Sequence, residues 1–207
     1  MTGTLQSVAS LAGLSISSVV QREASGGVAQ SPSLPAAKAG TLTTRTGDGA
    51  GAITLGAGHG LHQNDVVDVY WGTALASFGV RYGVKIDAVN GNDVSFDDTP
   101  AAGGDVLPAQ GTAVTVSKQV TIDTDFDGDL LEMIAAACDK RAHLDFQDAG
   151  GASLKAVTLL AGEIWSWFSG SGVTNPLSGN PVGSIKASNA DSAAAATLKI
   201  GLLYDST

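Results

Sequence analysis

The chain has 207 residues, a net charge of −9 and one cysteine, and 43% of its residues are hydrophobic. This acidic balance argues against nucleic acid as a partner, because phosphate binding needs clustered Lys and Arg. No run of about 18 apolar residues indicates a transmembrane helix, and the N-terminus lacks the regions of a signal peptide. We therefore expect synthesis in a cytoplasm and no membrane partner.

The first forty residues predict one strand followed by a connection. Residues 13–22 alternate between apolar and polar side chains, which is typical of a strand. Residues 23–40 are rich in Gly and Ser and contain two Pro, so they are expected to form a linker or a long turn.

Residues 41–118 predict a separate β unit. Five or six short strand-like runs follow one another there, separated by glycine-rich turns, as in a small β-barrel or sandwich. The pair Asn90-Gly91 is expected at the centre of a type I′ hairpin turn, where both positions need positive φ.

Residues 119–207 are also read mainly as strands. The segment 129–138 has an apolar face at helical spacing, but a continuous apolar strand would look similar at this length. A long Gly, Pro and Asn loop is expected at 170–183, followed by two strands that reach almost to the C-terminus.

These elements predict a mainly β fold with at most one or two short helices. We expect a β-sandwich formed by the N- and C-terminal segments, with a small β-barrel inserted between them. The expected divisions are 1–38, an N-terminal strand and linker packing on the C-terminal domain, 39–118, the barrel, and 119–207, the sandwich.

The acidic segment 120–134, VTIDTDFDGDLLEMI, contains half of a calcium loop. Asp123, Asp125, Asp127 and Gly128 fit positions 1, 3, 5 and 6 of an EF-hand, but Ile134 stands where the bidentate Glu is required. The alternative is a strand ending in an Asp-Gly turn, with Asp129 capping a following helix. We favour the turn, and expect no metal and no cofactor.

Catalytic motifs are lacking in the sequence. His59 and His62 are three residues apart in a glycine-rich turn, without a clear third ligand for a metal. No nucleophile elbow or phosphate-binding glycine loop occurs, and Cys138 lies in an apolar segment as an inert thiol would. We predict a protein that is not an enzyme.

Tryptophans offer two interpretations. On a strand, Trp165 and Trp167 share one face, which is either core or an aromatic platform for a sugar or a protein partner. Trp71, at the end of another strand-like run, is a further candidate for such a surface. The core interpretation is favoured for the pair.

The stretches GHGLHQNDVVDVYW and RYGVKIDAVNGNDVSFD resemble a small β-barrel module of structural proteins from tailed bacteriophages. Its pattern is an HGL turn, three residues, an Asp, a strand, and a hairpin ending in V-x-G-N-x-V. The matching residues are His59, Gly60, Leu61, Asp65, Val89, Gly91, Asn92 and Val94. The resemblance covers about 50 residues and implies a turn that is structural rather than catalytic.

The resemblance implies a virion protein made in the host cytoplasm. We expect a capsid decoration or cement protein, or alternatively a tail component, whose partners are other copies of itself and major capsid or tail proteins. Segments 23–40 and 170–183 are expected to be arms that order against neighbouring copies. Two other classes stay open: a carbohydrate-binding adhesin using Trp165 and Trp167, and a small hydrolase using His59 or His62.

Overall fold

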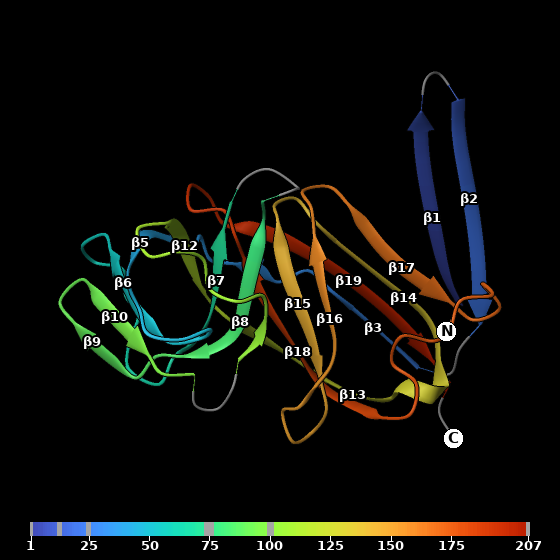
Figure 1. Ribbon diagram of the computed structural model, residues 1–207. Helices are drawn as coiled ribbons and strands as arrows, with labels where there is room; N and C mark the ends of the chain where they lie inside the picture. The colour runs from blue at the N-terminus through green and yellow to red at the C-terminus, as the bar shows by residue number, and fades with distance from the viewer. Residues whose placement is uncertain (1, 12–13, 24–25, 73–76, 99–101, 206–207) are drawn as a thin grey trace.

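The computed structural model describes residues 2–11, 14–23, 26–72, 77–98 and 102–205. Within these ranges the chain is all β, with antiparallel pairing throughout and no α-helix, which confirms the predicted mainly β class. Figure 1 shows two β units side by side. The strands are β1 (Thr2–Leu11), β2 (Leu14–Glu23), β3 (Gly26–Gln30), β4 (Ser33–Leu34), β5 (Lys38–Arg45), β6 (Gly51–Leu55), β7 (Val66–Trp71), β8 (Gly79–Lys85), β9 (Ala88–Asn90), β10 (Asp93–Phe96), β11 (Gly103–Gly104), β12 (Ala113–Lys118), β13 (Val120–Asp127), β14 (Leu131–Cys138), β15 (Ala142–Gln147), β16 (Ser153–Leu159), β17 (Ile164–Phe168), β18 (Pro181–Asn189) and β19 (Ala196–Tyr204).

Strands β5 to β12 form one eight-stranded sheet, here called the eight-stranded unit. Its order is β11-β8-β7-β12-β5-β6-β10-β9, and it curls around a core of aliphatic side chains such as Leu42, Ile53 and Val69. The sequence predicts a closed barrel for this region. The described strands instead form an open sheet, because β9 and β11 are its ends and no described pairing joins them.

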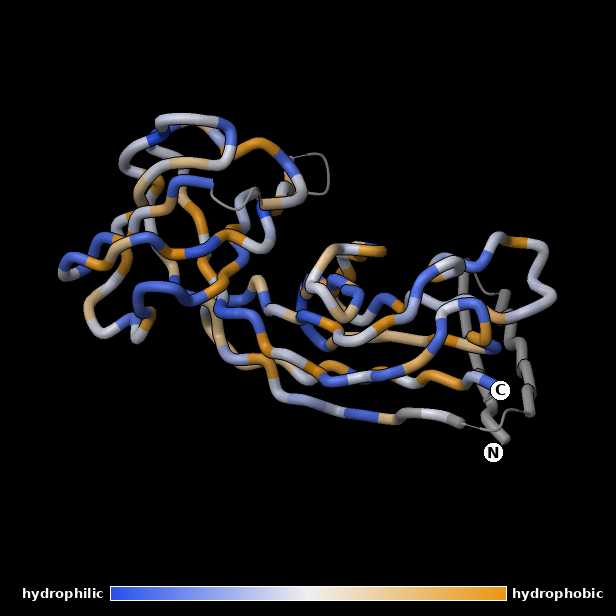
Figure 2. The backbone as a smooth tube through the Cα atoms, turned by 90° about the horizontal axis from the view of Figure 1, so that it is seen from below, coloured by the Kyte–Doolittle hydropathy of each residue, from blue (hydrophilic) through white to orange (hydrophobic). Residues whose placement is uncertain are grey.

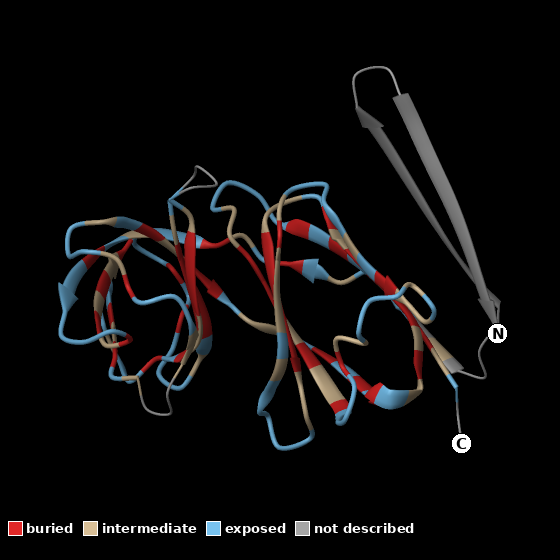
Figure 3. Cartoon of the chain, turned by 45° about the vertical axis from the view of Figure 1, so that its right-hand side comes forward, coloured by how far each residue is buried: buried red, intermediate tan, exposed pale blue. Residues whose placement is uncertain are grey.

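Strands β13 to β19, together with β3 and β4, form the two-sheet unit. One sheet has the order β13-β18-β15-β16 and the other β17-β14-β19-β3, with β4 also paired to β19. Residues from both sheets share one core, whose fully buried members include Ile134, Leu144 and Ile185. Figure 3 shows the buried residues running through the strands of this unit and of the eight-stranded unit.

In this unit the structure decides one open alternative and corrects one prediction. Residues 131–138 form strand β14, as the strand alternative has it, and the 3-10 turn that precedes them covers only Gly128–Leu130. Residues 26–34 contain strands β3 and β4 rather than a linker. Gly and Ser are compatible with these short strands because the pairing with β19 uses backbone groups alone.

The hairpin β1–β2 is the simplest element of the fold. Its strands pair along ten positions, from Thr2 with Glu23 to Leu11 with Leu14, and the described pairings of both strands are with each other.

The β9–β10 hairpin has a turn one residue later than predicted. Asn90 pairs with Asp93, so the two central residues are Gly91 and Asn92. Gly91 has φ +63°, whereas Asn92 is not among the described residues with positive φ. This is the requirement of a type II′ turn, with Gly at the first central position, rather than of type I′.

Candidate functional site

The HGL turn precedes β7 and is held in place by hydrogen bonds within the fold. The ring of His59 is buried; its Nδ1 accepts a hydrogen bond from the Leu61 amide at 3.1 Å, and its Nε2 lies 3.1 Å from the Gly91 carbonyl oxygen. Asp65 accepts a hydrogen bond from the His62 amide at 2.9 Å and pairs with the Lys118 ammonium at 2.5 Å. The motif therefore ties the turn to the β9–β10 hairpin and to β12.

The second histidine of this turn points elsewhere. The side chain of His62 is 79% exposed, and its Nδ1 lies 3.8 Å from an Asp65 oxygen. His59 is committed to two backbone groups inside the fold, so the structure does not bring the two rings together as a pair of metal ligands.

The acidic segment is a strand rather than a calcium loop. Asp123, Asp125 and Asp127 are exposed alternate residues of β13, which continues past the point where the sequence predicts a turn. Asp127, and not Asp129, caps the 3-10 turn, accepting a hydrogen bond from the Asp129 amide at 3.0 Å. Within the described ranges no three His, Cys, Asp or Glu side chains are grouped so that they could hold a metal ion.

The glycine of this segment has a packing role. A Cβ on Gly128 would lie 1.9 Å from the Leu177 carbonyl oxygen, so only glycine allows the 170–183 loop to approach so closely. Asn175 donates to the Gly128 carbonyl at 2.7 Å, and the Gly179 amide donates to Asp129 at 2.7 Å. The loop is therefore packed on its own chain rather than extended as an arm.

The three tryptophans pack against the two hydrophobic cores, and Trp165 and Trp71 are half-buried. Trp167 is 9% exposed and belongs to the core of the two-sheet unit, and its indole N–H donates to the Val173 carbonyl at 2.9 Å. The ring of Trp165 packs at the edge of that core, 5.6 Å from the centroid of Phe146. Trp71 packs against the other core. The positions of Trp165 and Trp167 agree with the core interpretation for the pair, whereas Trp71 also lines a surface pocket of about 410 Å³.

The junction between the units holds a buried polar cluster that the sequence analysis missed. Asp68, fully buried on β7, accepts hydrogen bonds from the Gly83 amide at 2.9 Å and from the Gln119 side chain at 2.7 Å. Its other oxygen accepts from the Ser188 hydroxyl, which also contacts the Tyr70 hydroxyl. Residues 120 positions apart in the chain are thus joined by one charge-assisted contact.

Burial dominates the electrostatics of this cluster. Desolvation raises the pKa of Asp68 to about 6, although the hydrogen bonds from Ser188, Gly83 and Gln119 favour the carboxylate. Burial also raises the pKa of Tyr70. Because substrate could not reach groups with so little exposed surface, the cluster can join the two units but cannot present a nucleophile.

Aromatic contacts extend the junction on both sides of the cluster. The rings of Tyr82 and His143 stack with centroids 4.3 Å apart, and the Arg141 guanidinium lies 4.0 Å above the ring of Phe78. Burial lowers the pKa of His143 to about 4, so this ring is neutral at physiological pH. The stack therefore behaves as an uncharged contact between β8 and β15.

A polar cleft of about 460 Å³ opens beside the junction. Tyr82 and Gly103 line it from the eight-stranded unit, and Asp145, Gln147 and Lys186 line it from the other. Asp145 accepts hydrogen bonds from Gln147 at 2.6 Å and from Ser153 at 2.5 Å, while burial raises its pKa. The cleft combines hydrogen-bonding groups with an aromatic wall.

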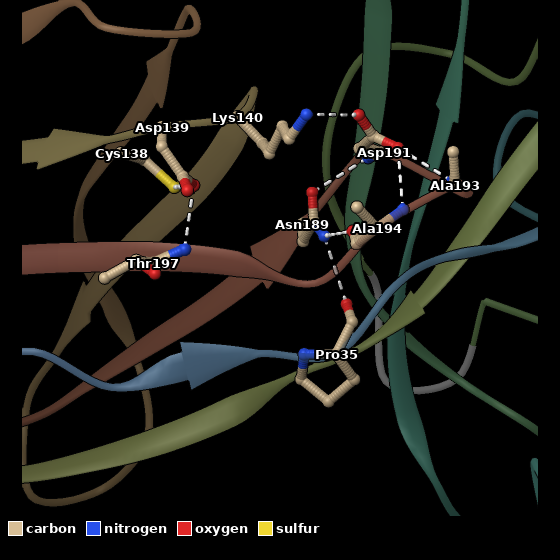
Figure 4. A network of polar contacts seen from close by, with 9 residues as sticks. All are labelled: Pro35, Cys138, Asp139, Lys140, Asn189, Asp191, Ala193, Ala194 and Thr197. Atoms are coloured by element: carbon tan, nitrogen blue, oxygen red, sulfur yellow. Dashed lines mark hydrogen bonds and ion pairs between the residues drawn. The ribbon is translucent and has the colours of Figure 1, made fainter.

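A second network fixes the loop that follows β18 (Figure 4). The buried Asn189 side chain donates to the Pro35 carbonyl at 3.3 Å and to the Ala194 carbonyl at 2.8 Å, and accepts from the Asp191 amide at 2.9 Å. Lys140 approaches the Asp191 carboxylate at 3.4 Å. These contacts tie the segment before β5 to the loop between the last two strands.

No described helix has the length and hydropathy needed to cross a bilayer. Comparison with protein-family models, with curated proteins and with solved structures found no match.

Proposed function

We propose that the chain is a non-enzymatic structural subunit of a bacteriophage particle that self-associates, with a capsid decoration or cement protein preferred over a tail component. The observation that carries this proposal is the HGL turn of the phage resemblance. The fold builds it as a structural turn: His59 accepts a hydrogen bond from the Leu61 amide and lies 3.1 Å from the Gly91 carbonyl oxygen.

The two-unit architecture supports the same role. The proposed arrangement is a sandwich made of the N- and C-terminal segments, into which a barrel-like unit of residues 39–118 is inserted. Each unit has its own core, and the Asp68–Ser188 contact and the Tyr82–His143 stack join the two units. The HGL turn, which carries the phage resemblance, has its polar groups satisfied within the fold, as a structural turn requires.

The direct test is the composition of gradient-purified phage particles, measured by quantitative mass spectrometry. The proposal predicts this chain at many copies per particle, in a fixed ratio to the major capsid or tail-tube protein. Separating heads from tails before the measurement decides between decoration protein and tail component. Detection of the chain only in the soluble fraction of infected cells would contradict both roles.

A second candidate function, in a different class, rests on the polar cleft. Tyr82 contributes its hydroxyl to the lining, while Asp145, Gln147 and Lys186 offer hydrogen-bonding groups of the kind that bind sugars. In this alternative the sugar-binding site is the cleft rather than Trp165 and Trp167. It predicts glycan-array binding that the Asp145→Asn variant loses and the exposed Asp123→Asn variant keeps. An array without any bound glycan would remove it.

A further inference from the structure

The β9–β10 turn contains an exposed asparagine that is followed by glycine. Asn90 is the last residue of β9, and its side chain makes no hydrogen bond within the described residues. The Gly91 amide likewise donates to no described acceptor, while the Gly91 carbonyl oxygen lies 3.1 Å from Nε2 of His59. The side-chain amide of Asn90 and the backbone nitrogen that follows it are therefore both unengaged.

This arrangement matters because an asparagine side chain reacts with the backbone nitrogen of the next residue. That nitrogen forms a bond to the side-chain carbonyl carbon, the bond from this carbon to the side-chain nitrogen breaks, and ammonia leaves. The product is a succinimide ring, which water opens at either carbonyl to give aspartate or isoaspartate. Water is the co-reactant, no oxidant or reductant is needed, and asparagine is accordingly a thermally labile residue type.

The residue after the asparagine decides whether the attack is possible. Gly has no Cβ to shield its nitrogen and is conformationally permissive, so it favours the reaction. Of the six asparagines in the sequence, Asn90 is the one that precedes Gly. Asn175 and Asn180 each precede Pro, which has no backbone N–H to react.

Hydrogen bonds hold the attacking amide at two further asparagines. After Asn64, the next amide donates to the His62 carbonyl at 3.1 Å. After Asn189, the next amide donates to the Arg141 carbonyl at 2.9 Å, and the Asn189 side chain is itself buried and hydrogen-bonded. Neither site combines a free amide with a free side chain.

The sixth asparagine is an internal comparison within the same turn. Asn92 is exposed like Asn90, but it precedes Asp93, whose side chain crowds the attacking nitrogen and whose backbone belongs to β10. Exposure and position in the turn are thus shared, and the following residue is what differs.

We propose that Asn90 is a site of spontaneous deamidation in the folded protein, giving aspartate and isoaspartate at position 90. Either product places a carboxylate opposite Asp93, the cross-strand partner of this position. Like charges directly opposite each other destabilise a strand pair.

Isoaspartate has a further effect, because it lengthens the main chain. The extra carbon enters between position 90 and Gly91 and adds about 1.5 Å of bond. The Gly91 carbonyl cannot then keep both its place in the turn and its 3.1 Å approach to the ring of His59. The modification therefore weakens the support that the β9–β10 hairpin gives to the HGL turn.

Peptide mapping by mass spectrometry tests the site. The full-length chain is incubated at neutral and at mildly alkaline pH, digested, and scored at each asparagine for the mass gain of an amide-to-acid conversion. We expect conversion at Asn90 before any conversion at Asn92, and faster conversion at alkaline pH because the attacking nitrogen must lose its proton. Labelling with protein isoaspartyl methyltransferase identifies the isoaspartate fraction.

Two variants serve as matched controls. Asn90→Gln keeps a side-chain amide but requires a larger ring, so position 90 should stay unconverted. Asn90→Asp adds the same charge without lengthening the main chain. The isoaspartate form, separated by ion exchange, should melt about 2–4 °C below Asn90→Asp, the shift expected for the loss of one hydrogen bond.

Three results would overturn the inference. If Asn90 stays intact in the native chain but converts in urea, the fold protects the site. If Asn92 converts first, the following glycine does not control the reaction. If the isoaspartate form melts like Asn90→Asp, the modification does not reach the HGL turn.

Discussion

At the scale of single residues, Asp68 is the most consequential group. Its pKa is raised to about 6 in the folded protein, so the stability it contributes is fully present below about pH 4 and is lost as pH rises through 6. Asp68→Asn keeps an acceptor for Gly83 and Gln119 and places an amide donor beside Ser188. Relative to wild type, we expect Asp68→Asn to raise the free energy of unfolding by about 2 kcal/mol more at pH 7.5 than at pH 4.5.

Urea unfolding of wild type and Asp68→Asn at the two pH values measures this difference. Asp123→Asn, which removes an exposed carboxylate on β13, is the control and should change little at either pH. An equal change in stability for Asp68→Asn at both pH values would contradict the prediction, because it would show that folding does not raise the pKa of this carboxyl group.

His143 has the opposite pH dependence. Its pKa is lowered to about 4 by burial, so its contribution is present above pH 6.5 and is lost as pH falls through 4. His143→Phe keeps a ring on Tyr82 and removes the titration. Between pH 7.5 and pH 4.5 the variant should lose about 2–3 kcal/mol less unfolding free energy than wild type.

The check is the same urea titration, read as a difference between pH values so that the lost contact with Thr158 cancels. Parallel pH profiles for His143→Phe and wild type would contradict the buried, neutral ring. In wild type the opposite trends of Asp68 and His143 partly offset each other between pH 4 and pH 6.5.

At the scale of elements, Gly128 joins β13 to the 170–183 loop. Its Cβ position is occupied by the Leu177 carbonyl oxygen, which belongs to backbone and cannot rotate away. We expect Gly128→Ala to lower the unfolding free energy by about 2–4 kcal/mol, with or without calcium. Gly56→Ala is the matched control, because no atom lies within 4 Å of its added Cβ.

Thermal unfolding in calcium and in chelator checks this prediction. A calcium-dependent stabilisation that Gly128→Ala abolishes would contradict the packing role and restore the acidic segment as a binding loop. A Gly128→Ala variant as stable as Gly56→Ala would show that the loop does not rest on β13.

The sequence predicts a strand correctly where one face of the strand is buried and the other is exposed to solvent. Alternating runs such as residues 113–118 belong to this class. β14 was ambiguous because both of its faces are apolar, one toward the core and the other carrying Met133, Ala135 and Ala137. β3 and β4 were missed because their pairing with β19 depends on backbone groups, which leave no side-chain pattern.

At the scale of the whole molecule, the junction could not be predicted because its contacts are long-range. Ser188 donates to Asp68 although the two residues are 120 positions apart, and no local sequence pattern near either residue indicates its partner. One local signal was present: Asp68 interrupts the apolar run Val66–Trp71, which indicates a carboxylate buried between two packed layers. Figure 2 shows apolar and polar residues interspersed along the chain in both units.

The central claim is that this chain is an assembling subunit, and the most direct test is its absolute mass by light scattering across a wide range of concentrations. The account predicts a discrete multiple of the 20.7 kDa chain that persists in chelator and in added calcium. A monomer at every concentration, with a melting temperature that rises in calcium, would contradict it. Such a result would make the acidic strand β13 the candidate functional site, as a calcium-binding segment.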